Sequence, residues 1–120
     1  MIYGIGVDLV DIRRIERAIS RWGQRFLDHI YTAAELELCA GKPRSLAARF
    51  AAKEAVMKAL GTGFQRAFWR DIEVLAEKDG RPVIKLSGRA RRSAYAIGVS
   101  GVTVSMSHSG DHAIACVIAF

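Results

Sequence analysis

The sequence predicts an α+β domain in which a small, mainly antiparallel sheet carries about three helices. Two observations support this fold class. Apolar residues recur at helical spacing in the first half of the chain, whereas short apolar or alternating runs separated by turn residues fill the second half. The length of 120 residues suits a single domain spanning residues 1–120.

The first predicted elements are a strand and a helix. Residues 4–10 form a short apolar run that leads into a turn, as a strand does. Asp11 is placed to cap a helix over residues 12–22, and Gly23 is placed to end that helix. These signals predict the order strand, turn, helix.

Two more helices are predicted in the first half of the chain. Thr32 and Glu35 have the spacing of a capping box, which predicts a second, short helix starting there. Residues 43–45 contain a proline and a serine, which mark a break and a new N-cap. A third helix is then expected over residues 46–60, and the Gly-Thr-Gly turn at 61–63 ends it.

The second half has the pattern of strands. Asp79-Gly80 lies between the apolar runs 72–75 and 83–86, which predicts a β-hairpin. The remaining predicted elements are a helix over 87–97, closed by a glycine, and strands over 102–108 and 113–118.

The chain is basic, with a formal net charge of +6, and this indicates an anionic partner: a phosphate compound, a nucleic acid or an acidic protein. No apolar run approaches the roughly 20 residues of a membrane span. Cys39 and Cys116 lie far apart and read as reduced thiols, and the first residues lack the basic region of a signal peptide. We therefore expect a cytoplasmic protein with no membrane partner.

The first helix has two contrasting sides, which lie within arcs of roughly 80° and 120°. The apolar side carries Ile12, Ile15, Ile19, Trp22 and Phe26, and the opposite side carries Arg13, Arg14, Arg17, Arg21 and Arg25. A solvated surface is one interpretation of the arginine side. Because a merely soluble face usually mixes both signs, capture of carboxylate or phosphate groups is the other.

The third helix carries two charged pairs. Arg49 and Lys53 are four residues apart, where like charges repel unless an anion binds between them. Glu54 and Lys58 have the same spacing in the favourable order, which a surface ion pair also explains. Asp8 lies at the end of the apolar strand, where a carboxylate is either an N-cap or a metal ligand; because Asp11 is available as the cap, the metal-ligand interpretation gains support. Asp8 and Glu54 would suit Mg²⁺ if the fold brings them together.

Two segments, Gly4–Ile15 and Arg49–Gly63, closely resemble the two signatures of the phosphopantetheinyl transferases, and the second signature is highly specific. The match is to the short bacterial type of this family. It extends over nearly the whole chain, including its length, the spacing between motifs and the Ser107-His108-Ser109 strand end. The resemblance implies the fold of that family and a homotrimer with active sites between subunits.

The resemblance also implies roles for individual residues. Asp8 and Glu54 would bind Mg²⁺ together with the diphosphate of coenzyme A, and Lys58 would contact the reacting phosphate. The adenosine diphosphate part of coenzyme A would be held by Arg49, Lys53, Gly61, Thr62, Gly63, Ser107 and His108. An acidic carrier protein would dock on Arg13, Arg14, Arg17, Arg21, Arg25 and Phe26. Glu35 is a weak candidate for a base or a water-orienting group.

The implied reaction is transfer of 4′-phosphopantetheine from coenzyme A to a serine of an apo acyl carrier protein, with release of 3′,5′-ADP, in support of fatty acid biosynthesis. Two other functions compete with it. A small nucleic-acid-binding module fits the basic charge, but aromatic residues are not interleaved with the basic ones. A zinc hydrolase based on His108 and His112 lacks a third ligand in the sequence pattern.

Overall fold

A computed structural model describes residues 1–61 and 66–120, and its elements confirm the α+β class. The elements are β1 (Gly4–Asp11), α1 (Ile12–Trp22), α2 (Gln24–Ile30), α3 (Ala33–Cys39), α4 (Pro43–Leu60), the 3₁₀ helix η1 (Arg66–Asp71), β2 (Ile72–Ala76), β3 (Pro82–Leu86), α5 (Gly88–Ala96), β4 (Val102–Ser109) and β5 (His112–Ala119). The expected number of helices was too low, because the described residues contain five α-helices. The strands also form two sheets instead of one.

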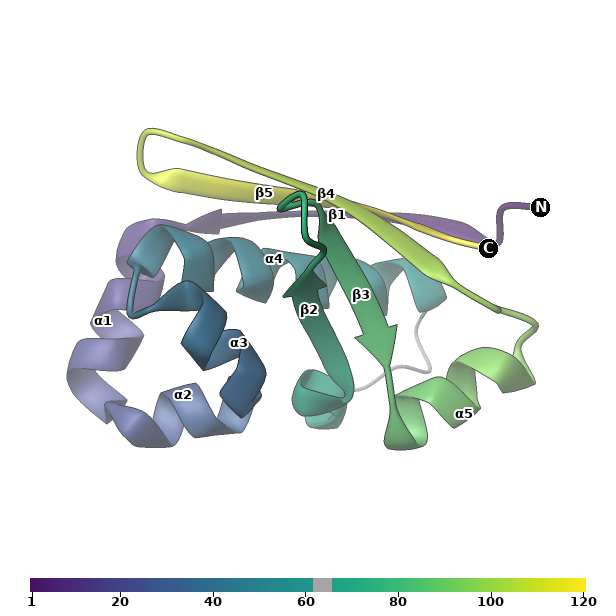
Figure 1. The fold of residues 1–120 in the computed structure, drawn as a ribbon, viewed down its shortest axis with the longest axis horizontal. Coiled ribbons are helices and arrows are strands. Elements are labelled where there is room, and N and C mark those ends of the chain that lie inside the picture. Colours follow the sequence, from purple (N-terminus) through teal and green to yellow (C-terminus); the bar gives the residue numbers. More distant parts are fainter. Residues whose placement is uncertain (62–65) are drawn as a thin grey trace.

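The larger sheet has three antiparallel strands in the order β1-β5-β4. Figure 1 shows α4 running along one side of this sheet, with the other helices on that same side. Alternate β5 side chains face α4 and are buried, from Ala113 to Ala119. On the opposite side, Ile5 and Leu9 are each 61% exposed and Val7 is 49% exposed. Within the described residues, this apolar side of the sheet has no cover.

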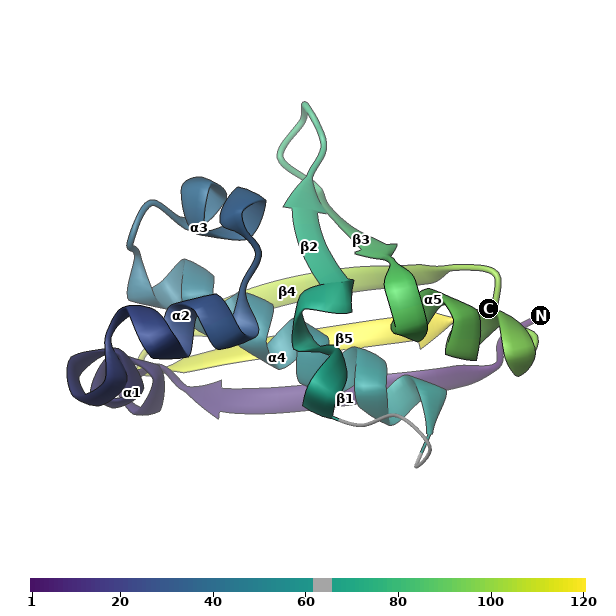
Figure 2. The same ribbon diagram turned by 90° about the horizontal axis from the view of Figure 1, so that it is seen from below.

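The second sheet is the predicted hairpin. β2 and β3 pair in antiparallel register, from Ile72 opposite Leu86 to Ala76 opposite Pro82. Figure 2 shows that the hairpin crosses the direction of the larger sheet and that its turn projects away from the body of the molecule. The base of β2 is nevertheless part of the core, because Ile72 and Val74 are fully buried.

The helix α4 forms the centre of the core, and 12 of its 18 residues are buried. Glycines in β1 allow the strand to lie against it. A Cβ atom at Gly6 would overlap the carbonyl oxygen of Ala55 and lie 2.9 Å from the amide nitrogen of Ala59. Gly4 approaches the carbonyl of Ala59 in the same way. The lack of side chains at these two glycines therefore sets the distance between β1 and α4.

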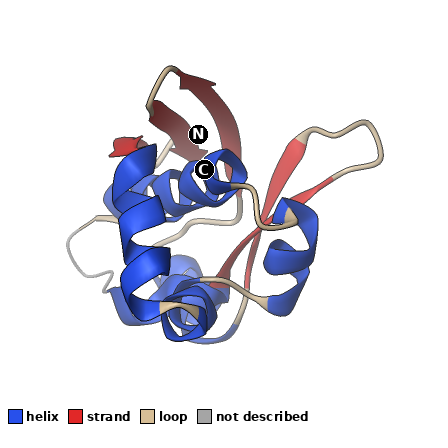
Figure 3. Ribbon diagram, turned by 90° about the vertical axis from the view of Figure 1, so that its left-hand side faces the viewer, coloured by secondary structure: helices blue, strands red, loops and turns tan. Residues whose placement is uncertain are grey.

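The predicted start and end of α1 are confirmed. The Asp11 carboxylate accepts a hydrogen bond from the backbone N–H of Arg13 at 2.9 Å, and Gly23, with φ of 57°, ends the helix. The following helix, α2, was not predicted. Figure 3, viewed from the left-hand side of Figure 1, shows the helical end of the molecule to which α1, α2 and α3 belong.

The start of α4 differs from the prediction. The helix begins at Pro43, not after Ser45, and Lys42 is its N-cap residue. Proline has a fixed φ and no N–H to leave unpaired, so it is well suited to the first helical turn. The proline that was interpreted as a break is therefore the beginning of the helix.

Candidate functional site

The first candidate group lies where β1 passes the last turns of α4. The Lys58 ammonium donates to Asp8 Oδ1 at 2.8 Å and to the carbonyl of Val7 at 3.2 Å. The Lys58 side chain is 55% exposed and that of Asp8 is 15% exposed, so the pair lies at the surface with its carboxylate largely covered. This contact depends on the close approach of β1 to α4 described above.

Glu54 lies one helical turn before Lys58 and is partly exposed. The pKa of Lys58 is raised above its ordinary value, first by the hydrogen bond to Asp8 and its charge, and further by attraction to Glu54. Both carboxylates therefore act on one ammonium group. Glu54 thus lies close enough to Lys58 for its charge to act on the ammonium that binds Asp8. That the two carboxylates share a metal ion stays a prediction.

Asp8 and Glu54 form a donor set that suits a hard cation. Within the described residues, no group of three or more His, Cys, Asp or Glu side chains lies together. Zn²⁺ sites in proteins usually take three or four such ligands. Mg²⁺ is commonly held by one or two carboxylates and completes its shell with phosphate oxygens and water. The residues present thus fit Mg²⁺ bound together with a phosphate compound.

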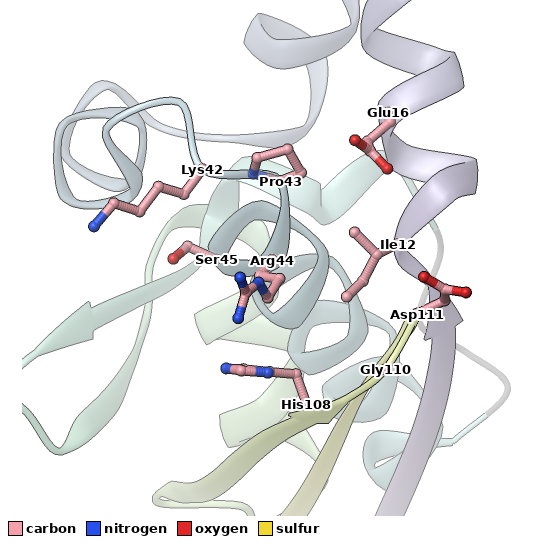
Figure 4. Close-up of a pocket in the computed structure, with 9 residues that line it drawn as sticks. All are labelled: Ile12, Glu16, Lys42, Pro43, Arg44, Ser45, His108, Gly110 and Asp111. Atoms are coloured by element: carbon pink, nitrogen blue, oxygen red, sulfur yellow. The ribbon is translucent and has the colours of Figure 1, made fainter.

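A pocket of about 970 Å³ lies between the starts of α1 and α4 and the turn that joins β4 to β5. Figure 4 shows Arg44 and His108 side by side on one wall and Glu16 on the opposite wall, contributed by α1. The lining residues are Ile12, Glu16, Lys42, Pro43, Arg44, Ser45, His108, Gly110 and Asp111. Arg44 from α4 and His108 from β4 give this wall a basic character that suits an anionic group.

A smaller hollow of about 200 Å³ shares Arg44, Ser45 and His108 with this pocket. Its lining also includes Arg49 and Ser107, so three of the predicted coenzyme A residues meet here. The sequence interpretation missed Lys42, Arg44 and Ser45. The proline at position 43 could have pointed to them. A helix that begins at this proline places these residues at its N-terminus, where anions are favoured.

Lys53 requires a correction. Its side chain is fully buried, and its ammonium donates to Glu35 Oε1 at 2.8 Å, to the carbonyl of Trp69 at 2.8 Å and to the carbonyl of Ile72 at 2.6 Å. Burial lowers the pKa of Lys53, and attraction to Glu35 opposes that shift. All three ammonium protons are used inside the core, so Lys53 offers no donor to coenzyme A.

Glu35 also has a different role from the one considered. Its carboxylate is fully buried and accepts hydrogen bonds from the N–H groups of Thr32 and Val74, in addition to Lys53. A carboxylate enclosed in this way has no path to a serine hydroxyl on another protein. The structure therefore removes Glu35 from the candidates for a catalytic base.

The turn after α4 is only partly described. Gly61 is exposed, with φ of 99°, and caps α4. Thr62 and Gly63 lie outside the described residues, so their contact with coenzyme A stays a prediction.

The arginine side of α1 is at the surface. Arg14, Arg17 and Arg21 are exposed there, and Arg25 is exposed on α2. Arg13 is also exposed, but its guanidinium is held by Asp11 at 2.9 Å. The predicted docking surface is thus presented to solvent.

The apolar side of α1 is less regular than predicted. Ile12 and Ile15 are buried, but Trp22 is 52% exposed, with the Arg21 guanidinium 5.0 Å from its ring centre. Phe26 packs against the core and meets the Tyr31 ring edge-on at 6.3 Å. Phe26 is only partly buried by this packing, so its contact with a partner stays a prediction.

None of the helices in the described residues has the length and apolar character needed to cross a membrane.

A family model described as the 4′-phosphopantetheinyl transferase superfamily matches residues 4–117. Among curated proteins, the holo-(acyl-carrier-protein) synthase of Desulforudis audaxviator is 49% identical over 99% of this chain and 93% of its own length. The protein of the same name from Dehalococcoides mccartyi strain 195 is 48% identical over 99% of this chain and 98% of its own length.

Solved structures show the same similarity. The holo-(acyl-carrier-protein) synthase of Neisseria meningitidis is 41% identical, with a TM-score of 0.89, and the match covers 100% of this chain and 99% of that one. The Helicobacter pylori enzyme, crystallised in complex with coenzyme A, is 32% identical with a TM-score of 0.84, and the match covers 97% of this chain and 99% of that one.

Proposed function

Because the chain belongs to the 4′-phosphopantetheinyl transferase superfamily, we propose that it is a holo-(acyl-carrier-protein) synthase. It transfers the 4′-phosphopantetheine group of coenzyme A to a serine of an apo acyl carrier protein and releases 3′,5′-ADP. The observation that carries this function is the surface contact of Lys58 with Asp8, where the charge of Glu54 also acts on the Lys58 ammonium. The family assignment decides against the nucleic-acid module and the zinc hydrolase.

The Asp8 and Glu54 carboxylates would hold Mg²⁺, which would supply positive charge to the diphosphate of coenzyme A. Lys58 donates to an oxygen of the reacting phosphate. Its raised pKa keeps the ammonium charged throughout the neutral range. The serine oxygen forms the new bond to the β-phosphorus, the bond from that phosphorus to 3′,5′-ADP breaks, and the serine hydroxyl proton passes to solvent water. Lys58 stabilises the negative charge that develops on the phosphate oxygens.

The basic pocket binds the adenosine end of coenzyme A. Arg44 and His108 line both this pocket and the smaller hollow, and Arg49 lines the hollow; their side chains suit the 3′-phosphate and the diphosphate. Arg44 and Lys58 are 14 residues apart on α4, a distance of about 21 Å along the helix axis. One chain therefore carries the basic pocket and the carboxylate pair near opposite ends of the same helix.

A homotrimer with active sites between subunits explains this separation. The uncovered side of the larger sheet exposes Ile5, Val7, Leu9 and Ile114, which favours burial against another copy of the chain. A neighbouring copy can then complete the site by setting its pocket beside the carboxylate pair of the first. The number of three subunits rests on the resemblance to the family.

The arginine surface of α1 and α2 docks the carrier protein. Arg14, Arg17, Arg21 and Arg25 are exposed and basic, and an acidic carrier offers opposite charge. Such contacts accelerate encounter and weaken with added salt. We place the enzyme in the cytoplasm, in fatty acid biosynthesis.

One assay tests the proposed function. The purified protein is incubated with coenzyme A, an apo acyl carrier protein and Mg²⁺, and the carrier is weighed by mass spectrometry. The expected result is a mass gain of one phosphopantetheine, which chelation of the metal abolishes. The matched control is Glu54→Gln, which removes one carboxylate charge at nearly constant size. An unmodified carrier with the wild-type protein, or full transfer in the presence of chelator, would contradict the proposal.

A further inference from the structure

The buried pair of Glu35 and Lys53 is not used in the proposed chemistry, yet it joins four segments of the fold. Lys53 on α4 binds carbonyls at the end of η1 and at the start of β2. Glu35 on α3 accepts from Lys53 and Thr32 through Oε1 and from the Val74 N–H through Oε2 at 2.8 Å. The described residues contain no buried side-chain nitrogen or oxygen without a partner. The pair is thus the centre of a fully satisfied network.

Val74 connects this network to the proposed coenzyme A pocket. Its N–H donates to Glu35, and its carbonyl accepts from Arg49 Nε at 3.1 Å. Arg49 is only partly buried and lines the smaller hollow. One residue of β2 is therefore fixed by Glu35 through its N–H and holds Arg49 through its carbonyl. A displacement of β2 from α3 would turn the Arg49 guanidinium away from its present direction.

The presence of such a pair in the core is poorly explained by its net contribution to the free energy of folding. Removing two charges from water costs several kcal/mol for each ion, and their attraction in the core roughly offsets that cost. What the pair does provide is a single arrangement, because three ammonium protons and two carboxylate oxygens each have a specified partner. An apolar pair of similar size would fill the space without fixing β2.

We propose that Glu35 and Lys53 are positioning residues that hold β2 against α3 and α4 and thereby orient Arg49 toward the phosphate groups of coenzyme A. This inference rests on the proposed function, because Arg49 is taken as a coenzyme A contact. It assigns neither residue to the chemical step.

The most direct test is Glu35→Gln. The amide keeps the size of the side chain but presents one oxygen and one NH₂ group, so it accepts from Lys53 or from Val74 and not from both. We expect calorimetric binding of 3′,5′-ADP to weaken about tenfold, with a similar rise in the KM for coenzyme A. The KM for the carrier protein should stay unchanged. The matched control is Glu73→Gln, a β2 carboxylate that accepts from Thr32, and it should leave 3′,5′-ADP affinity at the wild-type value.

A double-mutant cycle with Arg49→Ala separates positioning from general damage. If Glu35 acts through Arg49, Glu35→Gln has little further effect on 3′,5′-ADP affinity once Arg49 is removed. An equal loss of affinity in both backgrounds would overturn the inference, as would unchanged affinity in Glu35→Gln alone.

The variant Glu35→Leu with Lys53→Met covers the case in which Glu35→Gln fails to fold. Its melting temperature should stay near that of the wild type, because an apolar pair avoids the cost of burying charge, while its 3′,5′-ADP affinity stays low. Wild-type affinity in this folded variant would refute the positioning role. If the wild-type protein binds 3′,5′-ADP but transfers nothing, only the proposed function fails. The comparison of 3′,5′-ADP affinity between wild type and variants still tests the positioning role.

Discussion

Replacing Gly6 with alanine tests whether the close packing of β1 on α4 builds both the core and the Asp8–Lys58 contact. The added Cβ would overlap the carbonyl oxygen of Ala55 and lie 2.9 Å from its carbonyl carbon and from the Ala59 nitrogen. All three atoms belong to the backbone of α4. No side-chain rotation relieves this overlap, so the strand and the helix have to move apart.

The size of the effect follows from that geometry. Inserting a methyl group into a well-packed core costs about 1–3 kcal/mol, and an overlap with backbone belongs at the upper end, about 3 kcal/mol. For a domain of this length, such a loss lowers the melting temperature by about 10 °C. The separation also stretches the 2.8 Å hydrogen bond from Lys58 to Asp8. We therefore expect the rate of phosphopantetheine transfer to fall at temperatures where the variant is still folded.

Thermal unfolding followed by circular dichroism measures the first effect, and the mass-spectrometric transfer assay measures the second. Gly101→Ala is the matched control, because its Cβ would meet only the end of the Phe120 ring, at 2.8 Å, and that side chain is 45% exposed and free to turn. The control should melt within about 2 °C of the wild type. A Gly6→Ala protein that also melts within about 2 °C of the wild type would refute the packing argument.

Four other substitutions test separate features. Asp8→Asn should abolish transfer without changing the circular dichroism spectrum, and retention of most activity would remove Asp8 from the metal site. Hydrogen bonds from Arg13 lower the pKa of Asp11 from 3.8 to about 2, so its contribution to stability is present above pH 3.8 and is lost as the pH falls through about 2. Asp11→Asn should therefore destabilise the protein more at pH 6 than at pH 2 in urea unfolding, and an equal effect at both would contradict this. If the proposed trimer forms through the uncovered side of the sheet, Val7→Lys should give monomers by light scattering, and a mass equal to that of a wild-type oligomer would place the interface elsewhere. The charge reversal of Arg14 and Arg21 to glutamate should raise the KM for the carrier by about tenfold or more and leave that for coenzyme A unchanged; an unaltered carrier KM would remove the docking role.

Signals that depend on neighbouring residues were sufficient to predict most of the fold. Asp11 caps α1 as expected, Thr32 and Glu35 form the predicted capping box, and Asp79-Gly80 lies in the hairpin turn. Each of these is decided by side chains within four residues of the backbone groups that they bind. The helix α2 was not predicted, because it has only seven residues and its N-cap residue, Gly23, has no side chain that could mark a helix start.

The orientations of Lys53 and Lys58 relative to the core could not be predicted from the sequence. They are five residues apart on α4, about 140° around the helix, so they were certain to point in different directions. Their direction relative to the core was not certain, because α4 is buried on most of its circumference and its apolar residues mark no single inner side. The fold turned Lys53 inward to Glu35 and Lys58 outward to Asp8.

The sequence by itself therefore determined most of the elements, several of their caps and turns, and the family to which the motifs point. The tertiary structure alone decided which charges meet. Asp8 and Lys58 are 50 residues apart in the chain and Glu35 and Lys53 are 18 apart, and no local pattern records such pairings. They follow from the packing of β1 on α4 and of α3 on β2, because a charge enters the core only where the surrounding segments supply its partners.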